Sequence, residues 1–172
     1  KKDRLSNLKK FKKFKFLKIN ITKKKKLDKL FFQNKFKIVI HLAAQAGVRL
    51  SHDKPGIYVQ NNILGFYNII DAAKNNLTKH FIYASSSSVY GNSKNTISKE
   101  NDNTDKPISF YAASKKCNEV MAYSYSSIYS IPITGMRFFT VYGPMGRPDM
   151  SLYKFTKSIT ENKAIKLFNN GN

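Results

Sequence analysis

Cysteine and histidine are scarce in this sequence, with one and three copies among 172 residues. Cys117 has no second cysteine to pair with, so an intrachain disulfide is excluded and a reduced, cytoplasmic compartment is expected. The histidines His41, His52 and His80 lack the spacing of metal ligands, and we expect no metal site. A run of about 20 apolar residues, which a membrane-spanning helix requires, is also missing, so we expect no association with a membrane.

Acidic residues are few as well, with 10 Asp and Glu against 31 Lys and Arg, which gives a formal net charge of +21. Charge of this size is common in proteins that bind nucleic acid or an anionic surface. The excess is lysine within residues 1 to 29, densest at Lys23–Lys26, while arginine is sparse and no aromatic–basic recognition motif accompanies it. We interpret it as a solvated lysine-rich face without a nucleic-acid partner, and a basic binding module is the alternative.

A glycine-rich turn of the form Gly-x-x-Gly-x-x-Gly does not occur in the sequence, and the nearest match is Gly143-Pro-Met-Gly146. Such a turn brings backbone N–H groups at a helix N-terminus to the phosphates of a dinucleotide. The usual dinucleotide phosphate site is therefore missing from this chain. Its length is nevertheless that of one domain, which can bury a hydrophobic core.

Short apolar runs alternate with helix-type patterns along the chain, while the basic, irregular residues 1–13 are expected to be the end of a helix or a loop. The expected strands are Phe14–Asn20, Lys37–Ala44, Phe81–Ala84, Ile133–Phe138 and the start of one at Ile165–Phe168. The expected helices follow a Thr22 cap, run from Ile57 to Asn76 and from Tyr111 to Tyr129, and run from a Ser151 cap to Asn162. This alternation predicts an α/β fold with a parallel sheet and right-handed crossovers. The apolar run Lys37–Ala44 is typical of a sheet covered on both faces.

Tyr111 and Lys115 are four residues apart, a spacing that stacks two side chains on one face of a helix. A free tyrosine has a pKa of about 10, which must fall by roughly 3, or about 4 kcal/mol, before the phenol is a base near pH 7. One cation at about 4 Å, at an effective dielectric constant near 20, supplies roughly that energy. The pair therefore indicates a catalytic base, although the spacing alone also fits a partly buried tyrosine near a solvated lysine.

Four serines, Ser85–Ser88, follow the strand expected at Phe81–Ala84, and the carboxyl end of such a strand is where open α/β sheets bind ligands. Three longer stretches carry a resemblance to a known family: His41-Leu-Ala-Ala-Gln-Ala-Gly-Val-Arg49, Tyr83-Ala-Ser-Ser-Ser-Ser-Val-Tyr-Gly91 and Arg137-Phe-Phe-Thr-Val-Tyr-Gly-Pro-Met-Gly-Arg-Pro-Asp-Met150. With Tyr111-Ala-Ala-Ser-Lys115 they resemble the NAD-dependent nucleotide-sugar epimerases and dehydratases of the extended short-chain dehydrogenase/reductases, nearest the UDP-glucuronate 4-epimerases.

The resemblance runs from about Phe16 to the last residue, and it implies a Rossmann-like, doubly wound parallel sheet. Proteins of this family are about twice as long, so we expect an internal piece. It would start after the first strand, the glycine-rich turn and the first helix, and it would stop early in the substrate-binding lobe. Residues 1–172 are thus expected to be a partial NAD-binding domain, and the full-length protein to be a homodimer.

The family also implies roles for individual residues. The catalytic set is Ser86, Tyr111 and Lys115. NAD would contact Ala43, Ala44, Gln45, Asn61, Tyr111, Lys115 and Phe139, and the nucleotide sugar would contact Ser86, Ser87, Thr140 and Arg147. Small residues after a strand let a cofactor approach the backbone, although they also fit tight helix packing. Asn61 could equally be exposed, and Asn20 stands where the family has an acid beside the adenine of NAD.

These residues imply 4-epimerisation of a nucleotide sugar, with Tyr111 as the base and a transient 4-keto sugar. Arg147 would hold a sugar carboxylate and so favour UDP-glucuronate, unless it is a surface residue of its loop. One alternative is a 4,6-dehydratase, which needs an Asp-Glu pair where this sequence has Ser87 and Ser88. The other is a non-catalytic basic fragment, since a chain without the phosphate turn is expected to bind NAD weakly or not at all.

Overall fold

The structure is a computed structural model that describes residues 2–93, 96–165 and 167, and it divides into two compact units. The first unit is Lys1–Arg137 and the second is Phe138–Asn172. Of the strand expected at Ile165–Phe168, residues 166 and 168 lie outside the described residues.

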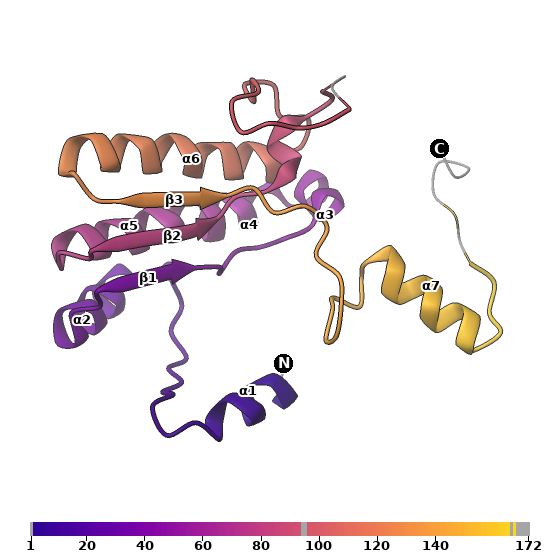
Figure 1. Cartoon of the computed structure of the whole chain (residues 1–172), viewed down its shortest axis with the longest axis horizontal. Coiled ribbons are helices and arrows are strands. Elements are labelled where there is room, and N and C mark those ends of the chain that lie inside the picture. The colour runs from indigo at the N-terminus through magenta and orange to yellow at the C-terminus, as the bar shows by residue number, and fades with distance from the viewer. Residues whose placement is uncertain (1, 94–95, 166, 168–172) are drawn as a thin grey trace. The chain divides into compact units, whose positions relative to one another are not determined.

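Strands and helices alternate in the first unit, and the described residues of the second unit form one helix (Figure 1). The strands are β1 (Ile38–His41), β2 (His80–Ala84) and β3 (Ile133–Met136). The α-helices are α1 (Lys2–Lys9), α2 (Lys24–Asn34), α3 (Val48–Asp53), α4 (Pro55–Tyr58), α5 (Gly65–Asn75), α6 (Phe110–Tyr129) and, in the second unit, α7 (Ser151–Thr160). A π-helical segment η1 (Val59–Leu64) joins α4 to α5, and a 3₁₀ turn η2 (Ser87–Tyr90) follows β2.

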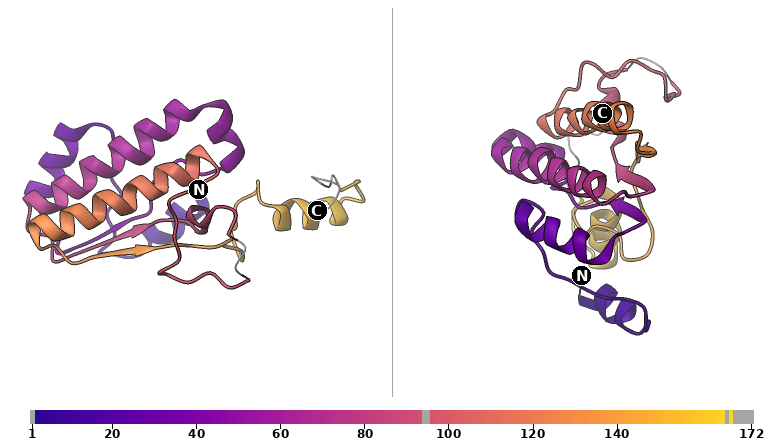
Figure 2. Two further views of the ribbon diagram at one scale, coloured as in Figure 1. Left: turned by 90° about the horizontal axis from the view of Figure 1, so that it is seen from above. Right: turned by 90° about the vertical axis from the view of Figure 1, so that its left-hand side faces the viewer.

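The three strands form one parallel sheet in the order β1-β2-β3, which confirms the predicted α/β class. Helices α5 and α6 lie along one face of this sheet (Figure 2), and α2 packs against α5. The core lies between the sheet and these helices, where Phe66 and Ile70 of α5 meet Phe81 and Tyr83 of β2. Parallel strands thereby bring their carboxyl ends, and the residues that follow them, to one edge.

Only one face of β1 is buried, which corrects the expectation that the run Lys37–Ala44 is covered on both sides. His41 points into the core, whereas Ile38 and Ile40 are each 61% exposed. Successive residues of a strand face opposite ways, so the even-numbered members of this apolar run lie on the side away from α5. The run also ends earlier as a strand, at His41, and Leu42–Ala44 lie outside the strand.

The strand predicted at Phe14–Asn20 is wrong, because a strand requires a hydrogen-bonded neighbour. Within the described residues, the sheet consists of β1, β2 and β3 paired with one another, and residues 14–20 belong to none of these ladders. Within residues 1–13, for which the end of a helix or a loop was expected, residues 2–9 form the helix α1. Alternating phenylalanine and lysine therefore misled the strand prediction, since periodicity alone carries no information on a partner.

Both predicted helix caps are also wrong. Helix α2 begins at Lys24, and the residue at its cap position, Lys23, makes no side-chain cap bond. Thr22 does not cap the helix; its hydroxyl and amide both donate to Asn20 Oδ1, at 3.0 and 2.9 Å. Ser151 is the first residue of α7, so Met150 occupies the cap position. Short polar side chains compete for local backbone and side-chain partners, which shifts a cap by a residue or removes it.

Candidate active site

Lys115 connects helix α6 to the end of strand β2. Its side chain is buried, with 3% of the residue exposed, and its Nζ donates a hydrogen bond to the backbone oxygen of Ala84 at 2.7 Å. Ala84 is the last residue of β2, and Ser85 and Ser86 follow it directly. A direct bond therefore ties the lysine to the end of β2, immediately before the serine segment, although 31 residues separate Lys115 from Ala84.

Tyr111 lies one turn before Lys115, in the first turn of α6. Ser109 caps this helix by accepting a hydrogen bond from the Ala112 amide at 3.1 Å, which fixes where the helix starts. The half-buried Tyr111 ring lies edge-on to the ring of Tyr58, with 6.1 Å between their centres. Because α6 also packs against η2, the predicted residues Ser86, Tyr111 and Lys115 come from elements in mutual contact at one end of the sheet.

Ser86 is buried and shapes the backbone of the serine segment. Its Oγ accepts a hydrogen bond from the Ser88 amide at 3.2 Å and caps η2. A hydroxyl that accepts one bond still has its own hydrogen to donate. Ser87 and Ser88, both half-buried, belong to η2 itself. The arrangement fixes where a ligand oxygen could meet the Ser86 hydroxyl.

The Lys115 side chain shares its surroundings with His41. Burial lowers the pKa of Lys115 to about 8, so part of the population is neutral at mildly alkaline pH. Burial also lowers the pKa of His41 to about 4, and the charge of Lys115 adds to this effect. The His41 ring lies against Phe66 and Phe81, with centres 5.6 and 6.4 Å away. From the sequence, His41 was considered only as a metal ligand, and its electrostatic link to the lysine was missed.

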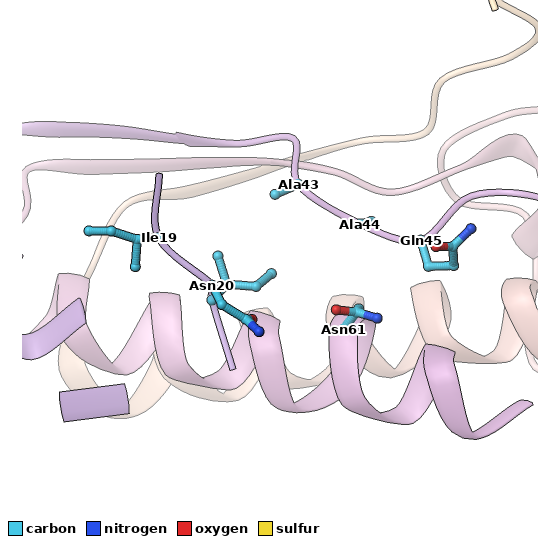
Figure 3. A pocket seen from close by; sticks show the side chains of 7 residues that line it. Ile19, Asn20, Ala43, Ala44, Gln45 and Asn61 are labelled. Carbon is cyan, nitrogen blue, oxygen red and sulfur yellow. The ribbon is translucent and has the colours of Figure 1, made fainter. Parts of the chain in front are cut away.

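A pocket of about 270 Å³ opens beside the end of β1 (Figure 3). Its lining residues come from the segment before α2, the segment after β1 and η1; they are Ile19, Asn20, Ile21, Ala43, Ala44, Gln45 and Asn61. Figure 3 shows Ala43 and Ala44 along one side and Asn61 on the helix opposite. Four of the residues predicted to bind a cofactor are therefore brought together. Two alanines at the rim leave the backbone accessible to a flat ligand, which fits the adenosine end of a dinucleotide.

Asn20 occupies the position at which the family has a carboxylate. Its Oδ1 already accepts two hydrogen bonds from Thr22, and a carbonyl oxygen has two lone pairs. With both lone pairs engaged, this oxygen is poorly placed to accept a further bond from a ligand. The amide nitrogen is the group of Asn20 that remains suited to contact a ligand in the pocket.

Asn62, which the sequence analysis did not single out, is a buried connector between the pocket and α6. Its Oδ1 accepts from the Gln45 amide at 2.8 Å, and its Nδ2 donates to the Gln45 carbonyl at 3.0 Å and to Ser114 Oγ at 3.0 Å. Ser114 in turn donates to the Tyr111 carbonyl at 2.7 Å. Asn62 lies within the π-helical segment, and such bulges are frequent at functional sites.

The second unit contains the remaining predicted residues, Phe139, Thr140 and Arg147. Phe139 is exposed, and Thr140 and Arg147 line a pocket of about 310 Å³ together with residues of α7. The Arg147 guanidinium is paired with the Asp149 carboxylate, with Nε 3.0 Å from Oδ1 and Nη2 in contact with Oδ2. This pair lowers the pKa of Asp149. The predicted carboxylate-binding arginine therefore has a carboxylate partner two residues away.

None of the helices in the described part of the chain is both long and apolar enough to cross a membrane. Among the described residues, no three His, Cys, Asp or Glu side chains gather as ligands for a metal ion.

All 172 residues match the NAD dependent epimerase/dehydratase family. The Staphylococcus aureus protein CapI is 48% identical over the whole chain, which covers 51% of that protein. The Arabidopsis thaliana UDP-glucuronate 4-epimerase 2 is 50% identical over 147 residues, which are 85% of this chain and 34% of that enzyme. The chain thus spans about half the length, or less, of these relatives.

Among solved structures, the chain resembles a UDP-glucuronic acid 4-epimerase from Bacillus cereus that was crystallised with UDP-glucuronic acid and NAD. The TM-score is 0.87 at 34% sequence identity, and the match covers 96% of this chain and 52% of that enzyme. About half of that enzyme and nearly all of this chain therefore share a fold.

Proposed function

The chain belongs to the NAD dependent epimerase/dehydratase family, and on that premise we propose that it is part of an NAD-dependent nucleotide-sugar 4-epimerase. It would be a partial NAD-binding domain, and the complete protein would interconvert UDP-glucuronate and UDP-galacturonate through a 4-keto sugar. The observation that carries the proposal is the bond from Lys115 to Ala84, which joins the Tyr111 helix to the end of β2, directly before the serine segment.

Each member of this group has a separate task. Tyr111 removes the proton from the sugar 4-hydroxyl and returns it, because it is the phenol at the start of α6 next to the serine segment. Lys115 supplies positive charge one turn away, held in place by Ala84. Ser86 donates its hydroxyl hydrogen to the reacting oxygen, and Ser87 contacts the sugar. Ser87 and Ser88 carry hydroxyls rather than carboxyl groups, which favours epimerisation over dehydration.

The residues at the pocket fit a dinucleotide, and NAD, when bound, supplies hydride transfer. Ala43 and Ala44 admit the ligand to the backbone, Gln45 is fixed by Asn62, and Asn61 lies on the opposite wall. Phe139 is assigned to the nicotinamide end. The glycine-rich phosphate site is not among these residues, so we expect the 172-residue chain alone to bind NAD weakly and to be inactive.

That expectation is tested by adding NAD to the chain alone and to the complete protein in a calorimeter. We expect saturable NAD binding by the complete protein and none by the 172-residue chain alone. Turnover of a nucleotide sugar by residues 1–172 alone would contradict it.

The preference for a uronate rests on Thr140 and Arg147. A sugar carboxylate that leaves water needs a paired cation or several donors, whereas a neutral hydroxymethyl group does not. Arg147 offers a forked set of donors, of which Nε and Nη2 contact Asp149. A uronate therefore binds the Arg147 guanidinium either beside the Asp149 carboxylate or in its place.

Turnover of UDP-glucuronate and UDP-glucose by the complete protein tests this preference, with Arg147→Ala and Asp149→Asn as the paired variants. We expect the wild type to prefer the uronate, Arg147→Ala to lose that preference, and Asp149→Asn to retain it. Equal use of both sugars by the wild type would contradict the substrate assignment and leave the epimerase assignment standing.

The complete protein is further proposed to be a homodimer. Helix α6 supports this proposal, because Val120, Tyr123 and Ile128 on its outer side are exposed apolar residues. Apolar side chains of one helix face can be buried by the same face of a second copy. Light scattering on the wild type and on a Val120→Glu variant tests it: the expected masses are those of a dimer and a monomer, and a monomeric wild type contradicts it.

A further inference from the structure

Glu119 lies on α6, one turn after Lys115, and it binds two other elements at once. Its Oε1 accepts a hydrogen bond from Ser85 Oγ at 2.6 Å and another from Arg137 Nε at 2.9 Å. Its Oε2 accepts from Arg137 Nη2 at 3.0 Å. The carboxylate thus forms a two-pronged pair with the guanidinium and holds a serine hydroxyl as well. Such fork-shaped, charge-assisted pairs are directional as well as strong.

Arg137 extends this cluster to the other side of the serine segment. Its guanidinium lies over the Tyr90 ring, 4.9 Å from the ring centre, and Tyr90 is the last residue of η2. Its Nη1 also donates to the backbone oxygen of Glu100 at 3.1 Å, in the loop after η2. Arg137 is the last residue of the first unit, just after β3. The segment from Ser85 to Tyr90 is therefore held at its first residue by Glu119 and at its last by Arg137.

The pair between Glu119 and Arg137 is largely sheltered from water. The Glu119 and Arg137 side chains are 15% and 19% exposed. Burial alone would raise the pKa of Glu119, but the hydrogen bonds from Arg137 and Ser85 outweigh it and lower the pKa. The carboxylate consequently stays ionised at neutral pH. A pair this sheltered is little screened by salt, and loss of one partner leaves the other charge uncompensated.

We propose that Glu119 is a positioning residue that sets the placement of Ser86 toward Tyr111 by fixing both ends of the segment Ser85–Tyr90. It acts through Ser85, the neighbour of Ser86, and through Arg137. One helix then places all the parts, since Tyr111, Lys115 and Glu119 follow one another at four-residue spacing on α6. This inference rests on the proposed function for its effect on turnover, whereas its structural part does not depend on turnover.

The structural part is tested by hydrogen–deuterium exchange of residues 85–91 in the complete protein. Glu119→Gln removes the charge and one acceptor oxygen, and Ser85→Ala removes only the first hydroxyl of the segment. The matched control is Asp71→Asn on α5, which removes the charge of a carboxylate paired with Lys24 and about as buried as that of Glu119, at 13% against 15% exposed. We expect exchange in residues 85–91 to accelerate about 10-fold or more in both test variants, and to stay unchanged in Asp71→Asn. Unchanged exchange in Glu119→Gln overturns the inference.

Turnover per NAD-loaded site tests the consequence for chemistry. Glu119→Gln should lower kcat by about 10- to 100-fold, as expected for a reacting group displaced by a fraction of an ångström to an ångström. Placed on a Ser86→Ala background, the same substitution should cost no more than about 2-fold further, because its effect runs through Ser86. If Glu119 only stabilised the fold, Glu119→Gln would leave fewer NAD-loaded sites, each with unchanged kcat. If Glu119 acted independently of Ser86, the losses in kcat of the two single variants would multiply in the double variant.

The two proposals fail in different ways. A wild type without turnover contradicts the proposed function, while the exchange experiment still decides whether Glu119 holds the serine segment. A wild type with turnover, together with a Glu119→Gln variant of normal kcat, contradicts only the positioning role.

Discussion

Replacing Lys115 by methionine should change how the stability of the folded chain depends on pH. Lysine in the unfolded chain has a pKa of 10.5, and burial lowers the pKa of folded Lys115 to about 8. Between these values the unfolded state binds a proton that the folded state does not, so the free energy of unfolding rises with pH. Because one pH unit corresponds to about 1.4 kcal/mol, the full gain is about 3 kcal/mol.

Below about pH 8 both states are protonated, and the folded chain carries the full cost of burying the ammonium group. Between pH 7.5 and pH 10, the free energy of unfolding of the wild type should therefore rise by about 2 kcal/mol more than that of Lys115→Met. Guanidinium chloride unfolding, followed by circular dichroism at both pH values, measures the difference. Lys116→Met, which removes a less buried lysine from the next position of α6, is the control. If wild type and Lys115→Met show the same pH dependence, the side chain is not buried as described.

Three further changes test the packing around the site. The wild type should lose about 3 kcal/mol of its free energy of unfolding between pH 7 and pH 4, because the unfolded chain binds a proton at His41 that the folded chain, with a His41 pKa of about 4, does not; His41→Phe should remove this loss, and unfolding measured across that pH range checks it. Gly135→Ala should cost about 1–3 kcal/mol, since the new Cβ would lie 2.5 Å from Cζ of Tyr83 and overlap its hydroxyl, whereas Gly56→Ala, with open space around it, should be nearly neutral in thermal denaturation. Asn62→Leu should cost about 2 kcal/mol or more by urea unfolding, because it leaves the backbone N–H and C=O after β1 without their buried partner; a cost near zero would contradict the connector role.

The elements that the sequence predicted well are those specified by local pattern. Tyr111 and Lys115 lie one turn apart on α6 because a segment without Gly or Pro forms a helix, and helical geometry fixes that spacing. The serine segment follows β2 because an apolar run forms a strand that ends in polar residues. Parallel strands then align their ends, so proximity of Ser86 to the helix follows from the topology. The α/β class and the pocket beside Ala43 and Ala44 could be anticipated for the same reason.

The features that the sequence did not predict depend on partners distant in sequence. Glu119 meets Ser85 across 34 residues, and Asn62 meets Gln45 across 17. No periodicity marks such pairs, since each residue is unremarkable within its own helix. The failed strand at residues 14–20 has the same origin, because a ladder needs a neighbour that the pattern cannot supply. The Thr22 cap failed because Asn20, two residues earlier, binds the same hydroxyl.

The proposed function is tested by following the conversion of UDP-glucuronate to UDP-galacturonate by the complete protein. The products are separated by chromatography and compared for wild type, Tyr111→Phe and Tyr67→Phe, the last removing a phenol, 38% accessible, from helix α5. We expect conversion by the wild type, a loss of about 100-fold or more in Tyr111→Phe with nucleotide-sugar binding retained, and wild-type rates in Tyr67→Phe. Wild-type rates in Tyr111→Phe would remove Tyr111 as the base, and a wild type that converts no nucleotide sugar would contradict the proposed function.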